Sequence, residues 1–419
     1  MSLVLCIRGT RYDCTEFSER HPGGRALLRM LNGQDATAHF DAMHAGSAAA
    51  ERTLLHLPQH DEKAPGTRRR PSRLARSLER LRREMESAQL FTPNPTPYFA
   101  RALALGAVLG AALSTRHVGA SATLFALFLQ QCAFIGHDAG HNSVLKNRRA
   151  NARLGLLVGN LCTGVSIGWW KSTHNTHHAA TNSLAWDPDI QHAPVLVVDR
   201  TYLQPAGVFS KFHARWLGAT PRQRVLARYQ HWYFYPLMLV ARFNLYFQSA
   251  CYACGPDAAT GEAVALFLYH AGLIAWTCSW GTPERALTWL GLSHALAGIL
   301  HVQIALSHFF MPCYPGPVQA GERFLRAQLA GTVDLAVPAW CAWFHGGLQY
   351  QATHHVFPRV PRDKLPAARQ RLLGLCRAHG VPYQTMGWWS ANAALLRSLA
   401  EHGKVGDTHL LRAGWLAAG

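Results

Sequence analysis

The chain has 419 residues, of which 49% are hydrophobic and only 15% are charged. Charged residues make up about a quarter of a soluble chain, so this deficit favours a membrane protein over two or three soluble domains. The formal net charge is +18, from 41 Lys and Arg against 23 Asp and Glu. Without a nucleic-acid-binding motif, this excess predicts contact with anionic lipid headgroups and no nucleic-acid partner.

The first residues, MSLVLCIRGTRYDC, lack the basic start, long apolar core and small-residue cleavage site of a secretory signal. We therefore expect the N-terminus to stay in the cytosol. The ten cysteines lack the paired spacing of a disulfide scaffold. One CxxC pair, Cys251 and Cys254, is more typical of small packing residues beside membrane segments than of a redox or metal site.

Residues 1–57 predict a small unit with two histidines that could bind haem. His21 precedes Pro-Gly-Gly, a loop that lets the backbone approach a flat ligand closely. The segment GQDATAHFDAMH ends in His44. Two histidines on facing helical hairpins can hold a haem iron from both sides, which gives a centre that carries electrons and leaves no position for oxygen.

The segments YDCTEFSERHPGG and GQDATAHF resemble the cytochrome b5 family over most of residues 8–50. The resemblance implies haem b with His21 and His44 as the two axial ligands. His39 lies nearby and competes with His44, but the family pattern, in which the ligand follows the Phe, favours His44. Because the unit starts so close to Met1, we expect its first strand to be short.

Residues 58–97 predict a basic linker and an amphipathic helix. The linker, PQHDEKAPGTRRRPSR, is polar and contains proline. Four apolar residues then recur at helical spacing among many arginines: Leu74, Leu78, Leu81 and Met85. Such a helix either lies on a membrane surface or packs against its own protein.

From residue 98 the sequence becomes strongly apolar and predicts an all-α membrane unit over residues 98–419. A stretch of roughly 20 apolar residues can cross a bilayer, and two stretches joined by a short turn form a hairpin. The stretch 232–250 contains Arg242, which is costly in hydrocarbon, so we predict an interfacial helix there. Four transmembrane helices are then predicted as two hairpins: 102–115 with 118–136, and 262–281 with 286–307.

Histidines are concentrated in three clusters of this unit. HDAGH places two of them four residues apart, on one face of a helix at the cytosolic end of the first hairpin. HNTHH and QATHH follow the same helical spacing, and together the clusters contain His137, His141, His174, His177, His178, His354 and His355. A zinc ion takes about four ligands, so this number fits two iron ions better, with positions left open for oxygen.

Four segments resemble the membrane-bound fatty acyl desaturases: HDAGH, GWWKSTHNTHHAATN, DPDIQH and WFHGGLQYQATHHVFPRVPR. The resemblance covers most of residues 1–375 and is closest to the front-end group, which has a fused N-terminal cytochrome b5 domain. In that group Gln replaces the first histidine of the third cluster, so Gln351 is the expected residue. The resemblance implies a small α+β haem domain, then an all-α integral membrane domain with four transmembrane helices and a cytosolic histidine-rich di-iron cap.

The resemblance also implies further site residues. The family uses a histidine at the cytosolic end of the fourth membrane helix, where HVQIALSHFF supplies His308 in preference to His301. Gln351 would form hydrogen bonds or bind iron weakly, because an amide oxygen is a poorer iron donor than imidazole. Three carboxylates would either accept imidazole N–H bonds or cap helices and turns: Asp138, Asp187 and Asp189.

By this resemblance we expect a lipid desaturase that uses oxygen, two iron ions and haem b, with electrons from NADH–cytochrome b5 reductase. We expect it in the endoplasmic reticulum membrane, or alternatively a plastid membrane, with both termini cytosolic. THHAATNSLAWDPDIQH and GGLQYQATHHVFPR look most like the sphingolipid delta-8 desaturases of fungi and plants, which act on the long-chain base. The alternative is a delta-6 or delta-5 acyl-lipid desaturase, and the third reading is a lipid hydroxylase. AGTVDLAVPAW departs from relatives that often carry TTMD, although Asp334 is retained.

Overall fold

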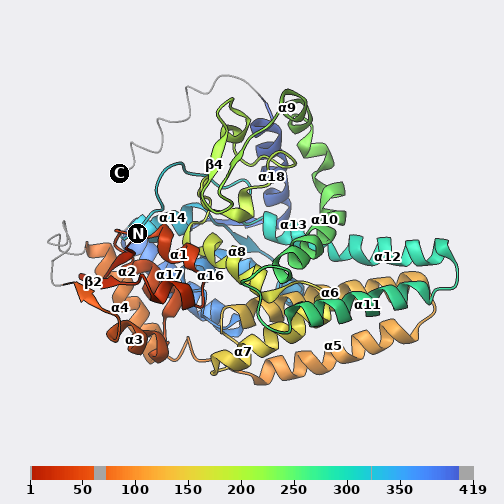
Figure 1. Ribbon diagram of the computed structural model, residues 1–419, viewed down its shortest axis with the longest axis horizontal. Helices are drawn as coiled ribbons and strands as arrows, with labels where there is room; N and C mark the ends of the chain where they lie inside the picture. The colour runs from red at the N-terminus through yellow and green to blue at the C-terminus, as the bar shows by residue number, and fades with distance from the viewer. Residues whose placement is uncertain (1, 61–71, 322, 405–419) are drawn as a thin grey trace.

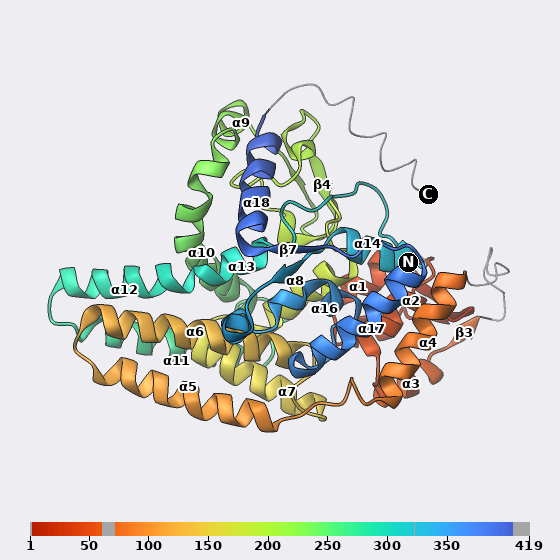
Figure 2. The ribbon, with the colours of Figure 1, turned by 180° about the vertical axis from the view of Figure 1, so that it is seen from behind.

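The computed structural model describes residues 2–60, 72–321 and 323–404. Most of the predicted basic linker lies outside the described residues. The N-terminal unit lies at one end of the molecule, and four long helices extend side by side away from it (Figures 1 and 2). These helices are α5 (Thr96–Ser114), α6 (Val118–Gly140), α11 (Glu262–Cys278) and α12 (Pro283–Ala297).

The N-terminal unit is a small α+β structure. β1 (Val4–Ile7) and β2 (Thr10–Asp13) form an antiparallel hairpin, and β3 (Gln59–His60) pairs with the other edge of β2. The hairpin turn needs positive φ at both central residues, which Arg8 (52°) and Gly9 (83°) adopt. Three helices pack their apolar side chains against this sheet in one buried core: α1 (Arg25–Met30), α2 (Thr37–His44) and α3 (Ala48–Leu55).

The amphipathic helix is α4 (Arg73–Ser87), which begins after Ser72, whose hydroxyl accepts the N–H of Ala75. Its apolar residues Leu81 and Met85 are buried in a core that also contains residues of α17 (Leu365–Ala378). Of the two expected roles for this helix, the structure therefore shows packing against the protein.

Three helices among the described residues are long and apolar enough to cross a membrane: 96–114, 118–140 and 283–305, the last of which combines α12 with α13 (Ile299–Ala305). The apolar α11 is shorter, with 17 residues. α12 packs against α6 through Trp289, which is fully buried and donates its Nε1–H to Ser121 Oγ at 2.9 Å. The two predicted hairpins thus correspond to α5–α6 and α11–α12.

The predicted interfacial segment forms α10 (Gln230–Ala253). Arg242 on this helix is 1% exposed and donates from Nε to Tyr246 Oη (2.9 Å) and from Nη2 to the Thr163 backbone oxygen (2.6 Å). Its other face leaves large apolar side chains such as Trp232 and Phe247 exposed. Protein groups therefore satisfy the buried charge of Arg242, and several large apolar side chains of α10 lie on the surface.

Two of the remaining helices carry histidine clusters. α8 (Ile167–Ala179) and the short, fully buried α16 (Gln351–Val356) approach the end of α6. The other elements are α7 (Arg148–Gly155), β4 (Val208–Ser210), β5 (Arg215–Leu217), α9 (Pro221–Ala227), α14 (Arg323–Ala330), β6 (Asp334–Ala336), α15 (Ala342–His345), β7 (Thr385–Gly387) and α18 (Trp388–His402).

Candidate haem and iron sites

The two predicted haem ligands face each other. His21 lies in the HPGG loop and His44 is the last residue of α2, and their ring centroids are 6.3 Å apart. The Nδ1 of each ring is within hydrogen-bond distance of a nearby backbone oxygen, that of Gly24 (3.3 Å) and that of Phe40 (3.0 Å) respectively. A Nδ1–H donor leaves Nε2 with a lone pair for a metal. Burial lowers the pKa of His44 to about 4, so this ring is neutral, as a ligand must be.

His39, the competing haem ligand, points elsewhere. Its side chain is buried, its Nε2 lies 2.9 Å from the backbone oxygen of Ala179, and its ring packs against Phe324. His44, and not His39, is therefore placed opposite His21.

The eight predicted iron ligands come together from α6, α8, α16 and the segment after α13. Seven of them form two groups, and within each group all ligand atoms lie within 4.8 Å of one another. One group is His137, His141, His174 and His354, and the other is His177, His308 and His355. His178 lies between the groups, with its ring centroid 4.6 Å from that of His174 and 4.2 Å from that of His355.

The unpaired ring nitrogens of these histidines fit a metal. Among the described residues, four buried ring nitrogens of the set have no hydrogen-bond partner, although buried polar atoms are normally paired. They are Nε2 of His137, His141 and His354 and Nδ1 of His178. Burial lowers the pKa of His174 to about 4, so its ring is also neutral. Neutral imidazoles with unused lone pairs are the ligands that iron takes in such sites.

Other ring nitrogens of the set are held by hydrogen-bond partners, as is usual for metal-binding histidines. Both Asp187 oxygens lie within 3.0 Å of His177 Nδ1. Burial alone would lower the pKa of His177, but Asp187 and Asp189 raise it to about 9. Asp189 itself is more distant, with Oδ2 3.6 Å from His174 Nδ1. Asp187 is therefore the principal partner of this pair.

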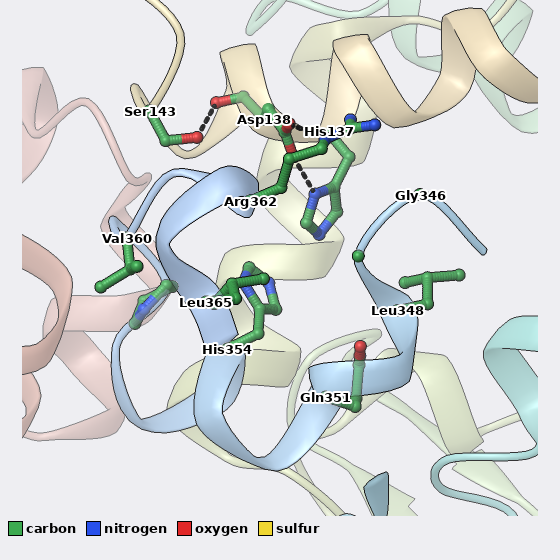
Figure 3. Close-up of a pocket in the computed structure, with 12 residues that line it drawn as sticks. His137, Asp138, Ser143, Gly346, Leu348, Gln351, His354, Val360, Arg362 and Leu365 are labelled. Carbon is green, nitrogen blue, oxygen red and sulfur yellow. Dashed lines mark hydrogen bonds and ion pairs between the residues drawn. The ribbon is translucent and has the colours of Figure 1, made fainter. Parts of the chain in front are cut away.

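Asp138 lines the small pocket beside the first group, together with His137 and His354 (Figure 3). Its Oδ1 lies 3.1 Å from His137 Nδ1, and its Oδ2 accepts hydrogen bonds from Tyr98 Oη and Arg362 Nε, both at 2.5 Å. Sequence reasoning identified Asp138 but missed Tyr98 and Arg362. Arg362 is the last residue of the segment WFHGGLQYQATHHVFPRVPR, yet no spacing in the sequence indicates that it reaches Asp138.

Gln351 lies at the second group. Its Nε2 is 3.1 Å from His308 Nε2 and 3.3 Å from His355 Nε2, while its Oε1 is buried without a partner among the described residues. The amide therefore contacts the ring nitrogens that face into the group. A third residue missed from the sequence, Gln328, accepts at Oε1 from His355 Nδ1 (3.1 Å) and donates to the His178 backbone oxygen (2.8 Å).

A cavity of about 560 Å³ lies between α5, α6 and residues 342–350. Most of its lining is apolar, from side chains such as Ala104, Leu105 and Ile135. It shares Gly346, Gly347 and Arg362 with the smaller pocket of Figure 3, which His137 and His354 line. Its size is typical of ligand sites, and it lies beside the small pocket that His137 and His354 line.

Residues 114–387 match the family Fatty acid desaturase, and residues 2–90 match the Cytochrome b5-like Heme/Steroid binding domain. The chain belongs to the fatty acid desaturase family. It is an oxygen-dependent desaturase with a fused cytochrome b5 domain, which indicates haem, and its apolar helices fit a membrane-embedded enzyme that acts on a lipid.

The relatives of this desaturase carry several names. It is 36% identical to "Delta(8)-fatty-acid desaturase 2" of Arabidopsis thaliana, over 95% of its own length and 89% of the relative's. It is 32% identical to "Acyl-lipid (9-3)-desaturase" of Borago officinalis, over the same two shares. It is also 34% identical to "Delta 8-(E)-sphingolipid desaturase" of Komagataella phaffii, over 67% of its length and 53% of the relative's.

Proposed function

We propose that this desaturase introduces a double bond at the delta-8 position of the long-chain base of a sphingolipid. The main support is its 36% identity, over nearly the whole chain, to a relative named for delta-8 desaturation. The K. phaffii relative is named for the sphingolipid substrate as well. The Borago relative, which is named for an acyl lipid, supports the alternative of a delta-6 or delta-5 acyl-lipid substrate. A lipid hydroxylase would use the same ligands and differ in its product.

We assign haem b to His21 and His44. One iron is assigned to His137, His141, His174 and His354. The second is assigned to His177, His308 and His355, and His178 lies beside both groups. Iron in these groups supplies, with oxygen, the oxidising power to remove one hydrogen from each of two adjacent methylene carbons. The protein's own part is to hold the imidazoles, and Asp187, Asp138 and Asp189 do so by accepting or lying near their Nδ1–H groups.

The cavity between α5 and α6 is the proposed path of the substrate chain. An apolar chain entering from the lipid side would run past Leu105 and Ile135 and reach the histidines at Gly346. Gly346 has a positive φ of 58°, and a Cβ there would lie 2.2 Å from the Phe134 ring. The lack of a side chain at this residue lets the backbone pack closely against Phe134 of α6, beside the two pockets that share this glycine.

We further propose the domains 1–57, 58–97 and 98–419, with four transmembrane helices, both termini in the cytosol and location in the endoplasmic reticulum. Hairpins α5–α6 and α11–α12 support this topology, because each returns the chain to the side on which the histidines gather. The electrons would come from NADH–cytochrome b5 reductase, which reduces cytochrome b5 domains of this kind.

The test is expression in a yeast that lacks sphingolipid delta-8 desaturase, followed by mass spectrometry of released long-chain bases and of fatty acid methyl esters. A new double bond in the long-chain bases is expected. New polyunsaturated acyl chains with unchanged long-chain bases would favour the acyl-lipid alternative, and hydroxylated products would favour the hydroxylase. Purified protein should contain iron and haem in a ratio of about two to one.

A further inference from the structure

Two helices that carry proposed haem and iron ligands meet across the two units. α2 ends at His44, and α8 ends at Ala179, one residue after His178. The last carbonyl groups of a helix have no partner inside the helix. At the end of each of these helices, a side chain from the opposite unit donates a hydrogen bond to a backbone oxygen. The His44 oxygen also accepts the Ser47 N–H at 2.9 Å.

His39 caps α8 from the haem unit. The Ala179 backbone oxygen accepts its Nε2–H at 2.9 Å, and its ring lies 4.5 Å from the Phe324 ring, centroid to centroid. The side chain is only 4% exposed. This histidine, which does not face His21, therefore bonds to the residue directly after a proposed iron ligand.

Arg359 caps α2 from the desaturase unit. It stands four residues after His355, and its Nη1 donates to the backbone oxygens of Ala45 and, at 3.3 Å, of His44. A cation at the C-terminal end of a helix also interacts favourably with the helix dipole. The end of α2, where the proposed haem ligand His44 lies, is thus bonded to a residue of the loop that follows the third histidine cluster.

The two caps lie in a packed interface. The Gly321 N–H donates to the Asp35 backbone oxygen at 3.2 Å, next to α2. Ala180 and Val318 of the desaturase unit belong to the same buried core as Leu27 of the haem unit. The caps therefore act where the two units already exclude water, which strengthens each hydrogen bond.

We propose that His39 and Arg359 are positioning residues that dock the haem unit on the desaturase unit in the arrangement that transfers electrons. This rests on the proposed function, since it requires haem at His21 and His44 and iron at the histidine groups. Haem held by His21 and His44 would supply one electron at a time, ferrous haem becoming ferric, to iron held by the histidine groups. Two such electrons, two protons and the two hydrogens of the lipid convert one oxygen molecule to two waters. Docking supplies the proximity and orientation that a flexible tether alone does not.

The test measures the rate at which the reduced haem is reoxidised. The full-length protein, loaded with haem and iron, is placed in lipid nanodiscs containing a ceramide substrate, and the haem is reduced without oxygen. The sample is then mixed with oxygenated buffer, and haem reoxidation is followed by absorbance. An iron-free sample gives the background rate of reoxidation.

The variants His39→Ala and Arg359→Ala should each slow the iron-dependent reoxidation at least tenfold, with unchanged haem content and absorption spectrum. His39→Gln keeps an N–H donor and should recover most of the rate. An excess of soluble cytochrome b5 should restore product formation by His39→Ala, because its iron site is intact. Matched controls are His56→Ala, an exposed histidine bonded within its own helix region, and Arg371→Ala on the surface of α17.

Reoxidation at the wild-type rate in both alanine variants would overturn the proposal. Loss of haem from His39→Ala, or failure of soluble cytochrome b5 to restore product, would also overturn it, since the residue would then support haem binding or the iron site. A wild-type haem that reoxidises no faster than the iron-free sample would instead contradict the proposed function. The two failures are therefore distinguishable.

Discussion

Asp187→Asn should weaken iron binding at the second histidine group. Asp187 is fully buried, and its two oxygens accept hydrogen bonds from His177 Nδ1, from the Asn182 backbone (2.7 Å) and from the Asp189 backbone (2.9 Å). An asparagine keeps one accepting oxygen, while its NH₂ group cannot accept, so at least one of these donors loses its partner. Loss of such a partner of a metal ligand costs about 10- to 100-fold in metal affinity, or about 1.4 to 2.8 kcal/mol.

The measurement is the iron content of purified protein after equilibration with increasing concentrations of a chelator. We expect the iron proposed for the second histidine group to leave Asp187→Asn at a 10- to 100-fold lower chelator concentration than in the wild type. Asp189→Asn is the comparison variant and should have a smaller effect, because its carboxylate is about a third exposed and lies 3.6 Å or more from the rings. Equal retention of iron by Asp187→Asn and the wild type would refute the reasoning, as would an equally large effect of Asp189→Asn.

Three further predictions concern the cavity and the metal. Gly346→Ala should lower both thermal stability and activity, because positive φ costs a residue with a Cβ about 1 to 2 kcal/mol and the new Cβ would meet Phe134; an unchanged melting temperature would contradict this. Ala104→Trp should reduce conversion of longer bases relative to shorter ones in the yeast assay, whereas Ala102→Trp, an exposed residue that does not line the cavity, should not. Dialysis against an iron chelator should abolish activity but leave the haem spectrum intact, and added ferrous iron should restore activity; haem loss in parallel with iron would count against separate sites.

Local periodicity explains how much of the candidate site could be predicted from the sequence. Histidines four residues apart, such as His137 and His141, share a helix face whatever the rest of the fold does. The family pattern then favoured His44 over His39 and indicated His308. The structure places His44 opposite His21, and His308 beside His177 and His355. Apolar length likewise predicted the two hairpins, although α11 is shorter than a full span.

Contacts between distant segments could not be predicted, because they depend on how helices pack. The charged Arg242 looked unsuited to hydrocarbon, and packing supplies it with Tyr246 and the Thr163 backbone. The stripe of α4, which could equally have faced a membrane, packs against α17. No sequence spacing links Arg362 to Asp138, which are more than two hundred residues apart.

The sequence by itself determined the class of chemistry here: which residue types are available as ligands, on which helix faces, and beside which apolar segments. These properties are local, since they follow from residue identity and helical repeat. Tertiary structure alone decided the division of the histidines into two groups, the hydrogen bond of His39 to α8, and the apolar cavity beside the pocket that the histidines line. Those features depend on packing and hydrogen bonding between remote segments, and they form only when the chain folds.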